Sequence, residues 1–257
     1  MNKSTKIILS VASACLLAFL AWGIIYKSST ATDYDINSII PASEKSGGIP
    51  EHIEYFKKST SNTTSNTTSN TTSETPDESI TPELVIIEYS DYQCSGCAAH
   101  VEPVAELVKK YAGKVAVVHR SYILSYHTNG FAASAAAEAA GLQGYWKEYG
   151  DYLFKNQEDW FYSDADTRLD QFKRYFEVVT DHKGDLEKFV SDMSSPEVSA
   201  KVNFDISIAK KASAASNIEY TPAFFIDGEF INFAYDNPDE LSFVDYMSRI
   251  IDAKLTK

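Results

Sequence analysis

Two cysteines three positions apart, Cys94 and Cys97, constrain this chain more than any other feature. They follow the β-branched, apolar run 84–89, which is typical of a buried strand, and precede residues 98–111, where apolar side chains recur at helical spacing. The sequence therefore predicts a strand, a short turn and a helix whose N-terminus carries the pair. Unpaired backbone NH groups and the helix dipole favour a thiolate there. We expect Cys94 to be the attacking thiol and Cys97 the resolving one.

A metal site, a haem and an inert structural disulfide are the rival interpretations of this pair. A structural zinc site usually has four ligands, and the only other cysteine is Cys15, in an apolar N-terminal segment; His100 could be a third ligand, but no fourth is evident. A c-type haem would need a histidine directly after Cys97, where Ala98 stands. A redox pair is the favoured interpretation, and we predict no metal and no other cofactor.

The N-terminus predicts export of the rest of the chain. Residues 7–25 carry no charge and are long enough to cross a bilayer, and Lys3 and Lys6 precede them, which favours an N-terminus inside the cell. We expect residues 1–27 to be a membrane anchor; a cleaved signal peptide and a lipoprotein attached at Cys15 are the alternatives. All three place the remainder outside the cytoplasm, where disulfides persist. The expected localisation is the cell membrane, with one span.

Residues 28–80 are expected to be a polar, disordered linker, because they contain a Ser-Asn-Thr-Thr repeat over 61–72. A short helix over 50–58 is the one element that we expect within it. We expect residues 81–257 to form the folded domain. That domain has 17 Lys and Arg against 28 Asp and Glu, which argues against nucleic acid as a partner.

The remainder of the domain predicts two βα-type halves around a helical insertion at about 122–216. Residues 115–120 predict a second strand after the first helix. Asp227-Gly228 lies between the short apolar runs 223–226 and 229–231 and predicts a hairpin. The expected helices cover residues 128–142, 144–156, 167–179, 185–193, 196–216 and 238–254.

The dipeptide Thr221-Pro222 stands directly before a predicted strand. A proline there can simply occupy an edge position. In combination with a CxxC between a strand and a helix, it indicates a cis proline beside the cysteines.

Together these motifs resemble the DsbA-like thiol:disulfide oxidoreductases of the thioredoxin superfamily, most closely their membrane-anchored bacterial branch. The resemblance extends from about residue 83 to the C-terminus. It implies an α/β, thioredoxin-like fold with a helical insertion domain. The segments that carry it are EYSDYQC at 88–94, AAAEAA at 135–140, LFKNQ at 153–157 and YTPAFFIDG at 220–228.

The resemblance also implies roles for single residues. Cys94 corresponds to the exposed nucleophile, Cys97 to its buried partner and Pro222 to the cis proline. The backbone of Thr221 is expected to pair with an extended substrate segment. Glu88 falls where the family often has a buried acid that relays protons to the resolving cysteine; an exposed strand-end carboxylate is the alternative.

Five further side chains have a structural and a functional interpretation. His127 matches a recurrent family histidine, and we favour a structural hydrogen bond over catalysis. The aromatic residues of the insertion are expected to pack in the core rather than to border a peptide groove; they are Tyr145, Trp146, Tyr149 and Trp160.

The predicted function is that of a monomeric extracytoplasmic oxidase that introduces disulfides into reduced exported proteins. The resemblance implies reoxidation by a quinone-linked integral membrane partner. A reductase or isomerase of the same fold, and a peptide-binding chaperone without redox turnover, are the alternatives. Gly96 stands where strongly oxidising members often carry a histidine, which predicts a milder potential.

Overall fold

The computed structural model describes residues 40, 43–56, 70–73, 82–233, 236–237 and 239–256. The predicted anchor at 1–27 and most of the predicted linker lie outside these residues. Within the described part, no helix combines the length and the apolar character that crossing a membrane requires. All described residues belong to one compact unit, Ile36–Lys257.

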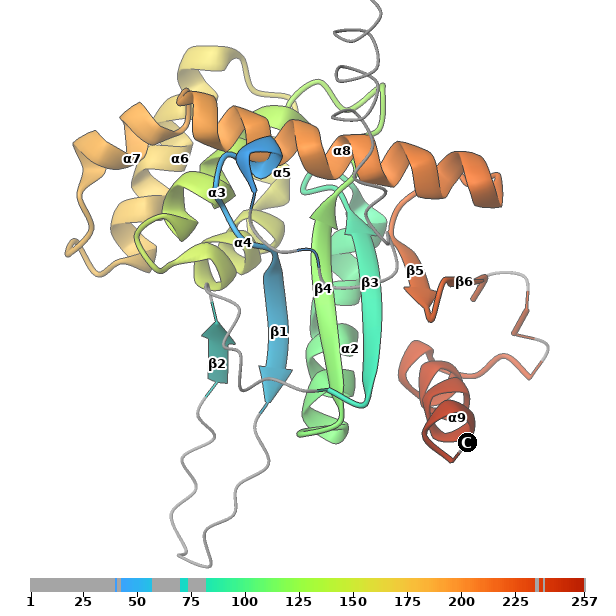
Figure 1. Cartoon of the computed structure of the whole chain (residues 1–257). Coiled ribbons are helices and arrows are strands. Elements are labelled where there is room, and N and C mark those ends of the chain that lie inside the picture. The colour runs from blue at the N-terminus through green and yellow to red at the C-terminus, as the bar shows by residue number, and fades with distance from the viewer. Residues whose placement is uncertain are drawn as a thin grey trace, which may run out of the picture. The chain divides into compact units, whose positions relative to one another are not determined.

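The described strands form one mixed sheet in the order β2-β1-β4-β3-β5-β6 (Figure 1). The central strands β3 and β4 are parallel, and every other neighbouring pair is antiparallel. Helices cover β3 and β4 on both faces, which explains their nearly continuous apolar sequences. The bounds are His52–Phe56 for β1, Asn70–Ser73 for β2, Leu84–Ser90 for β3, Val115–Ser121 for β4, Ala223–Ile226 for β5 and Glu229–Ile231 for β6.

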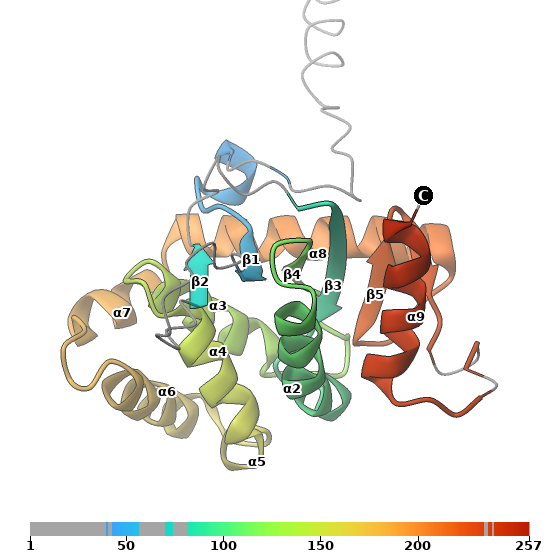
Figure 2. The same cartoon turned by 90° about the horizontal axis from the view of Figure 1, so that it is seen from below.

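Helices α2 (Ser95–Lys110) and α9 (Phe243–Leu255) lie on one face of the sheet, and α8 (Pro196–Ser216) crosses the other (Figure 2). Ile86 and Val117 of the sheet, with Val108 of α2 and Met247 of α9, are at most 1% exposed in the core between them. The predicted strand, turn and helix around the cysteines are confirmed. The hairpin is confirmed too: Asp227 and Gly228 have φ of 50° and 78°, as a two-residue turn between right-twisted strands needs.

The predicted helical insertion is confirmed between β4 and β5. Most of it packs beside β1 and β2, while α8 returns across the sheet (Figures 1 and 2). The insertion has an aromatic core of its own, in which the rings of Phe176 and Phe189 stack with centroids 4.3 Å apart. Its first helices are α3 (Gly130–Gly141), α4 (Trp146–Lys155), α5 (Gln157–Trp160), α6 (Ala165–Val179) and α7 (Leu186–Asp192).

The helix that we expected over 50–58 is wrong, because residues 52–56 form β1 in the sheet. The short 3-10 helix η1 (Glu44–Ser46) precedes it and contacts α8. The fold thus includes part of the segment that we assigned to a linker. Side chains from residues 51–54 pair with buried charged groups of the domain, and such polar residues resemble linker composition when only the sequence is considered.

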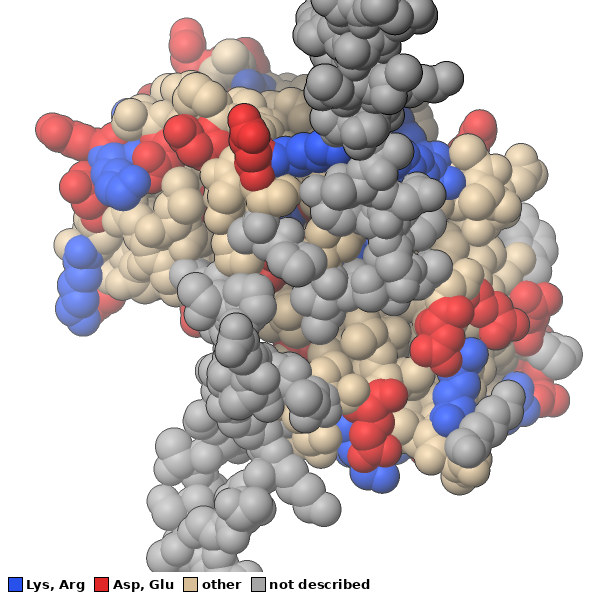
Figure 3. Space-filling view, in the orientation of Figure 1, with Lys and Arg blue, Asp and Glu red and all other residues tan. Residues whose placement is uncertain are grey.

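The surface carries both charge signs. On the face seen in Figure 3, acidic and basic side chains are interspersed. This pattern agrees with the solvated, predominantly acidic surface that the composition predicts.

Candidate redox site

The cysteine pair lies at the carboxyl end of β3, where the chain turns into α2. Cys94 is the N-cap residue of α2, and Cys97 is in its first turn. Cys94 is 9% exposed and Cys97 1%, so the first sulfur is the more accessible one. Both are free thiols.

The Thr221–Pro222 segment packs directly against the cysteines. Its peptide bond is cis. The thiol of Cys94 donates a hydrogen bond to the Thr221 carbonyl oxygen at 3.3 Å. A Cβ atom added to Gly96 would lie 3.5 Å from Cys94 Sγ, Pro222 Cδ and Thr221 O, so these groups surround the Gly96 backbone. The structure therefore brings together all four residues that the sequence places in this part of the site.

The two sulfurs differ sharply in acidity. A hydrogen bond from the Cys97 side chain is the largest cause that lowers the pKa of Cys94 to about 5; the backbone amides of Gly96 and Cys97 at the start of α2 add to it, and burial opposes them. Burial raises the pKa of Cys97 well above its ordinary value, and the nearby Cys94 raises it further. At neutral pH the reduced pair is thus a thiolate at Cys94 beside a thiol at Cys97.

A fully buried carboxylate, Asp91, holds the turn between β3 and α2. Its Oδ1 accepts a hydrogen bond from the Gln93 amide at 2.9 Å. Its Oδ2 accepts from the Leu124 amide at 2.9 Å and faces His127 Nδ1 at 2.7 Å. This contact is the hydrogen bond that we expected of His127. Asp91 was not predicted, although a carboxyl residue three positions before the first cysteine is a signal for a turn.

Two side-chain amides, also missed, tie the same turn to the helical insertion. Gln93 Nε2 donates to the Phe161 carbonyl at 2.8 Å, and Gln93 Oε1 accepts from the Asn129 amide at 2.7 Å. The Asn129 side chain in turn donates to the carbonyl oxygens of Trp160, Phe161 and Ser163. The residue before Cys94 is therefore fixed by contacts from the insertion.

Glu88 is 5% exposed and lies opposite His119 in the β3–β4 register. Its Oε2 is 2.9 Å from His119 Nδ1. The alternative of an exposed strand-end carboxylate is wrong, because the side chain points into the domain. A proton-relay role for Glu88 stays a prediction.

The predicted core packing of the aromatic residues is confirmed. Tyr149 and Trp160 are fully buried, Trp146 is 9% exposed, and Tyr145 packs against the same aromatic core. His100 bonds through Nδ1 to the Gly96 carbonyl at 2.8 Å. Across the described residues, no group of three or more His, Cys, Asp and Glu side chains is arranged to hold a metal ion.

A family model described as thioredoxin matches residues 81–253. Among solved structures, oxidised BdbD from Bacillus subtilis aligns with a TM-score of 0.53 and 17% identity over 68% of this chain and 89% of its own. Alpha-DsbA1 from Wolbachia pipientis aligns with a TM-score of 0.50 and 20% identity over 67% and 85%. The resemblance to the DsbA-like fold is thereby confirmed.

Curated relatives give a more partial match. The Na(+)/H(+) antiporter NhaA of Herminiimonas arsenicoxydans is 28% identical over 154 residues, which is 60% of this chain and 22% of the antiporter. An NhaA 1 of Mycolicibacterium vanbaalenii is 27% identical over 146 residues, 56% of this chain and again 22% of that protein. The chain therefore spans about a fifth of the length of these relatives.

Proposed function

Because this chain belongs to the thioredoxin family, we propose that it is a DsbA-like thiol:disulfide oxidoreductase that introduces disulfides into exported proteins through Cys94 and Cys97. One observation carries the proposal: the acidities of the two sulfurs are shifted in opposite directions beside Thr221–Pro222. A structural disulfide does not require two thiols of different pKa. A redox-active pair does, because the sulfur that is attacked first, that of Cys94, must later leave easily as a thiolate.

The reaction begins with the Cys94–Cys97 disulfide and a reduced substrate. A substrate thiolate attacks Cys94 Sγ, the more accessible sulfur, and a bond forms between them. The Cys94–Cys97 bond breaks, and its electron pair remains on Cys97 Sγ, which takes up a proton because its pKa is high. A second substrate thiolate then attacks the substrate sulfur of the mixed disulfide. Cys94 leaves as a thiolate, and the substrate is oxidised while the enzyme is reduced.

The low pKa of Cys94 supports the oxidising direction. A stabilised thiolate lowers the free energy of the reduced enzyme relative to its disulfide, which makes the disulfide a better oxidant. The Thr221 carbonyl, which already bonds the Cys94 thiol, is placed to pair with an extended substrate segment beside the mixed disulfide.

Turnover requires that the dithiol be reoxidised. We assign this step to a quinone-linked integral membrane protein, and we place the domain outside the cytoplasm on an anchor formed by residues 1–27. The uncharged run at 7–25 supports the anchor. The domain is taken to act as a monomer and without nucleic acid.

A trapping experiment tests the proposed function and the roles of the two sulfurs. We expect Cys97→Ala to accumulate mixed disulfides with exported proteins at Cys94, whereas Cys94→Ala accumulates none. Equal trapping by the two variants would contradict the assignment.

The equilibrium potential of the pair tests the direction of electron flow. A value near or above about −180 mV supports an oxidase, and a value near that of thioredoxin, about −270 mV, supports a reductase instead.

A further inference from the structure

A cavity with both polar and apolar lining lies between the sheet and helices α2 and α4. Its volume is about 50 Å³. One water molecule needs about 10–15 Å³ on this measure, so the cavity has room for a few waters. The charged side chains that line it include Glu54 of β1, Glu88 of β3 and His119 of β4, with Lys147 and Asp151 of α4.

The lining of the cavity includes one residue that bonds to Cys97 and one that reaches solvent. Ser90 lines the cavity, and its side chain hydrogen bonds to Cys97. Asp151 lines it too; its side chain is 45% exposed, and its Oδ2 contacts Lys147 Nζ at 2.6 Å. A proton that moves from Asp151 through the cavity to Ser90 therefore comes next to the sulfur of Cys97.

His119 stands between two carboxylates on the wall of this cavity. Its Nδ1 is 2.9 Å from Glu88 Oε2, and its Nε2 is 3.4 Å from Glu54 Oε2. Nε2 has no hydrogen-bond partner among the described residues. An imidazolium carries a proton on each ring nitrogen, so a carboxylate beside Nε2 can stabilise the charge while Nδ1 gives its proton to Glu88 and regains it.

The charge on His119 depends on both neighbours. Burial opposes the charge, but Glu54 and Glu88 outweigh it and raise the pKa of His119 to about 9. Lys147 also approaches Glu54, with Nζ 4.0 Å from Oε2. The other titratable groups that line the cavity are His52, Tyr92, Arg120, Glu138 and Asp205.

Glu54 comes from a part of the chain that the family model does not match. That model begins at residue 81, whereas Glu54 belongs to β1, the antiparallel neighbour of β4. The N-terminal strand therefore adds a second carboxylate to a histidine of the thioredoxin-like domain.

We propose that Glu54 is a positioning residue of the redox cycle, which holds His119 as the middle member of a proton path between solvent at Lys147–Asp151 and Cys97. The proposal rests on the proposed thiol:disulfide exchange. The path runs through the cavity water, His119 and Glu88. The N-terminal strand completes it by supplying the carboxylate at Nε2.

The proton moves towards Cys97 when the disulfide is reduced and away from it when the dithiol is reoxidised. When a substrate thiolate opens the Cys94–Cys97 bond, the electron pair stays on Cys97 Sγ. His119, which carries a proton on each ring nitrogen, gives its Nδ1 proton to Glu88, Glu88 gives a proton to the cavity water, and the water gives one to Cys97 Sγ. The Nε2 proton stays on the Glu54 side, and Nδ1 is protonated again from solvent through the cavity water. Reoxidation of the dithiol reverses every transfer.

The test measures reduction of the Cys94–Cys97 disulfide by dithiothreitol in the full chain, at pH 6 to 9 and in H₂O and D₂O. Rates are divided by the concentration of dithiothreitol thiolate. Without Glu54, the pKa of His119 falls and less imidazolium remains at high pH. For Glu54→Gln we expect a rate loss that grows with pH and reaches about tenfold near pH 8.5, as partial loss of general acid catalysis predicts.

Two further variants separate the relay from a merely structural role. Glu54→Asp, which keeps the carboxylate, is expected to restore part of the rate. Glu148→Gln removes a carboxylate from the exposed side of α4 and is expected to change neither the rate nor the solvent isotope effect. A second relay variant, His119→Gln, is expected to abolish the pH-dependent component. Circular dichroism at each pH establishes that each variant is folded.

The outcomes distinguish this inference from the proposed function. If the wild-type disulfide does not exchange with dithiothreitol, the proposed function fails. If the wild type exchanges and folded Glu54→Gln matches it at every pH, or loses the same factor at every pH, the proton path through Glu54 is overturned.

Discussion

The two ends of the sheet are stabilised by different interactions. One, which we call the redox end, comprises β3 and β5 with α2 and α9. Its core side chains are aliphatic and aromatic, and the cysteine pair lies where β3 leads into α2. The other, the charged end, comprises β1 and β4 with α3 and α8. There Arg120, Glu138, Lys201 and Asp205 are at most 3% exposed.

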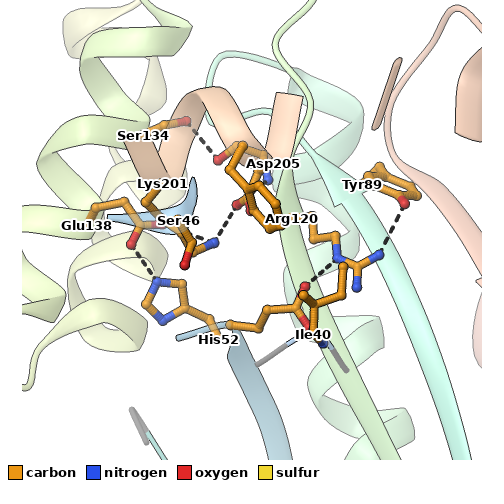
Figure 4. Close-up of polar contacts among 12 residues, drawn as sticks. Ile40, Ser46, His52, Tyr89, Arg120, Ser134, Glu138, Lys201 and Asp205 are labelled. Carbon is orange, nitrogen blue, oxygen red and sulfur yellow. Dashed lines mark hydrogen bonds and ion pairs between the residues drawn. The ribbon is translucent and has the colours of Figure 1, made fainter. Parts of the chain in front are cut away.

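Each buried charge of the charged end has a partner of opposite sign (Figure 4). Arg120 Nε contacts Glu51 Oε1 at 2.5 Å, and its guanidinium also donates to the Tyr89 hydroxyl at 3.2 Å. Lys201 Nζ contacts Asp205 Oδ2 at 2.6 Å. Glu138 faces Lys201, with Oε1 4.0 Å from Nζ, and its Oε2 accepts a hydrogen bond at 2.8 Å from Nε2 of His52, whose pKa is lowered by burial.

The difference shows how the N-terminal segment is attached. Apolar burial has no direction, whereas a buried ion pair holds its partners in one register and is costly when one of them is missing. Glu51, His52 and Glu54 each contact a group of the domain, so ion pairs and a buried hydrogen bond position β1 and the residue before it.

Removing the N-terminal segment should lower the stability of the charged end more than any other change proposed for the two ends. A chain that begins at Thr81 keeps Arg120 but lacks its buried counter-ion Glu51, and Glu138 loses its hydrogen bond with His52. Since an uncompensated buried charge costs about 3–5 kcal/mol, we expect this chain to lose most of a typical stability of about 5–15 kcal/mol. Urea unfolding followed by circular dichroism measures the loss, with a chain that begins at Ile36 as the control. Equal stability of the two chains would refute the idea that β1 compensates the domain's charges.

Arg120→Met tests one ion pair of the charged end. The substitution leaves Glu51 buried without its cation, and we expect a loss of about 3–5 kcal/mol in the free energy of unfolding. The double variant Arg120→Met with Glu51→Gln should lose less than the sum of the single variants, because the two residues are coupled. Additive losses would show that the pair does not interact energetically.

At the redox end we expect stability to depend on the volume of the packed side chains and not on charge. Ile86 is 1% exposed in the core between β3, α2 and α9. Ile86→Ala should cost about 3 kcal/mol by creating a cavity, and Ile86→Leu, which conserves volume, should cost less than about 1.5 kcal/mol. If the two variants lose the same stability in urea, packing volume does not govern this end.

The smallest expected effect is the pH dependence of the reduced pair. The pKa of Cys94 is lowered to about 5, below that of an unfolded thiol at about 8.5. Its thiolate therefore stabilises the folded, reduced protein above pH 8.5, and this contribution is lost as the pH falls through 5. Between pH 7 and pH 6 we expect the reduced form to lose about 1.4 kcal/mol of stability relative to the disulfide form.

The ultraviolet absorbance of the Cys94 thiolate follows the same titration. The disulfide form, which has no thiolate, is the matched control. A midpoint of the absorbance change near pH 8.5 would contradict the assigned acidity of Cys94.

Much of the redox end could be predicted because its signals are local. An apolar run followed by a CxxC predicts β3 and α2, Asp227-Gly228 predicts the final hairpin, and Thr221-Pro222 before a strand indicates the cis peptide. Turn chemistry and the periodicity of apolar side chains act within a few residues, so one stretch of sequence contains the whole signal.

The charged end depends on tertiary structure. Glu54 and His119 are 65 positions apart, and His52 and Glu138 are 86 apart. Along the sequence, a strand with charged residues at buried positions resembles a solvated linker, because its partners lie far away in the chain. The sequence by itself determined the dithiol and the strand-helix unit that presents it. Only the tertiary structure decided that an N-terminal strand joins the sheet and sets a carboxylate beside His119, since the free energy of a buried charge depends on what surrounds it.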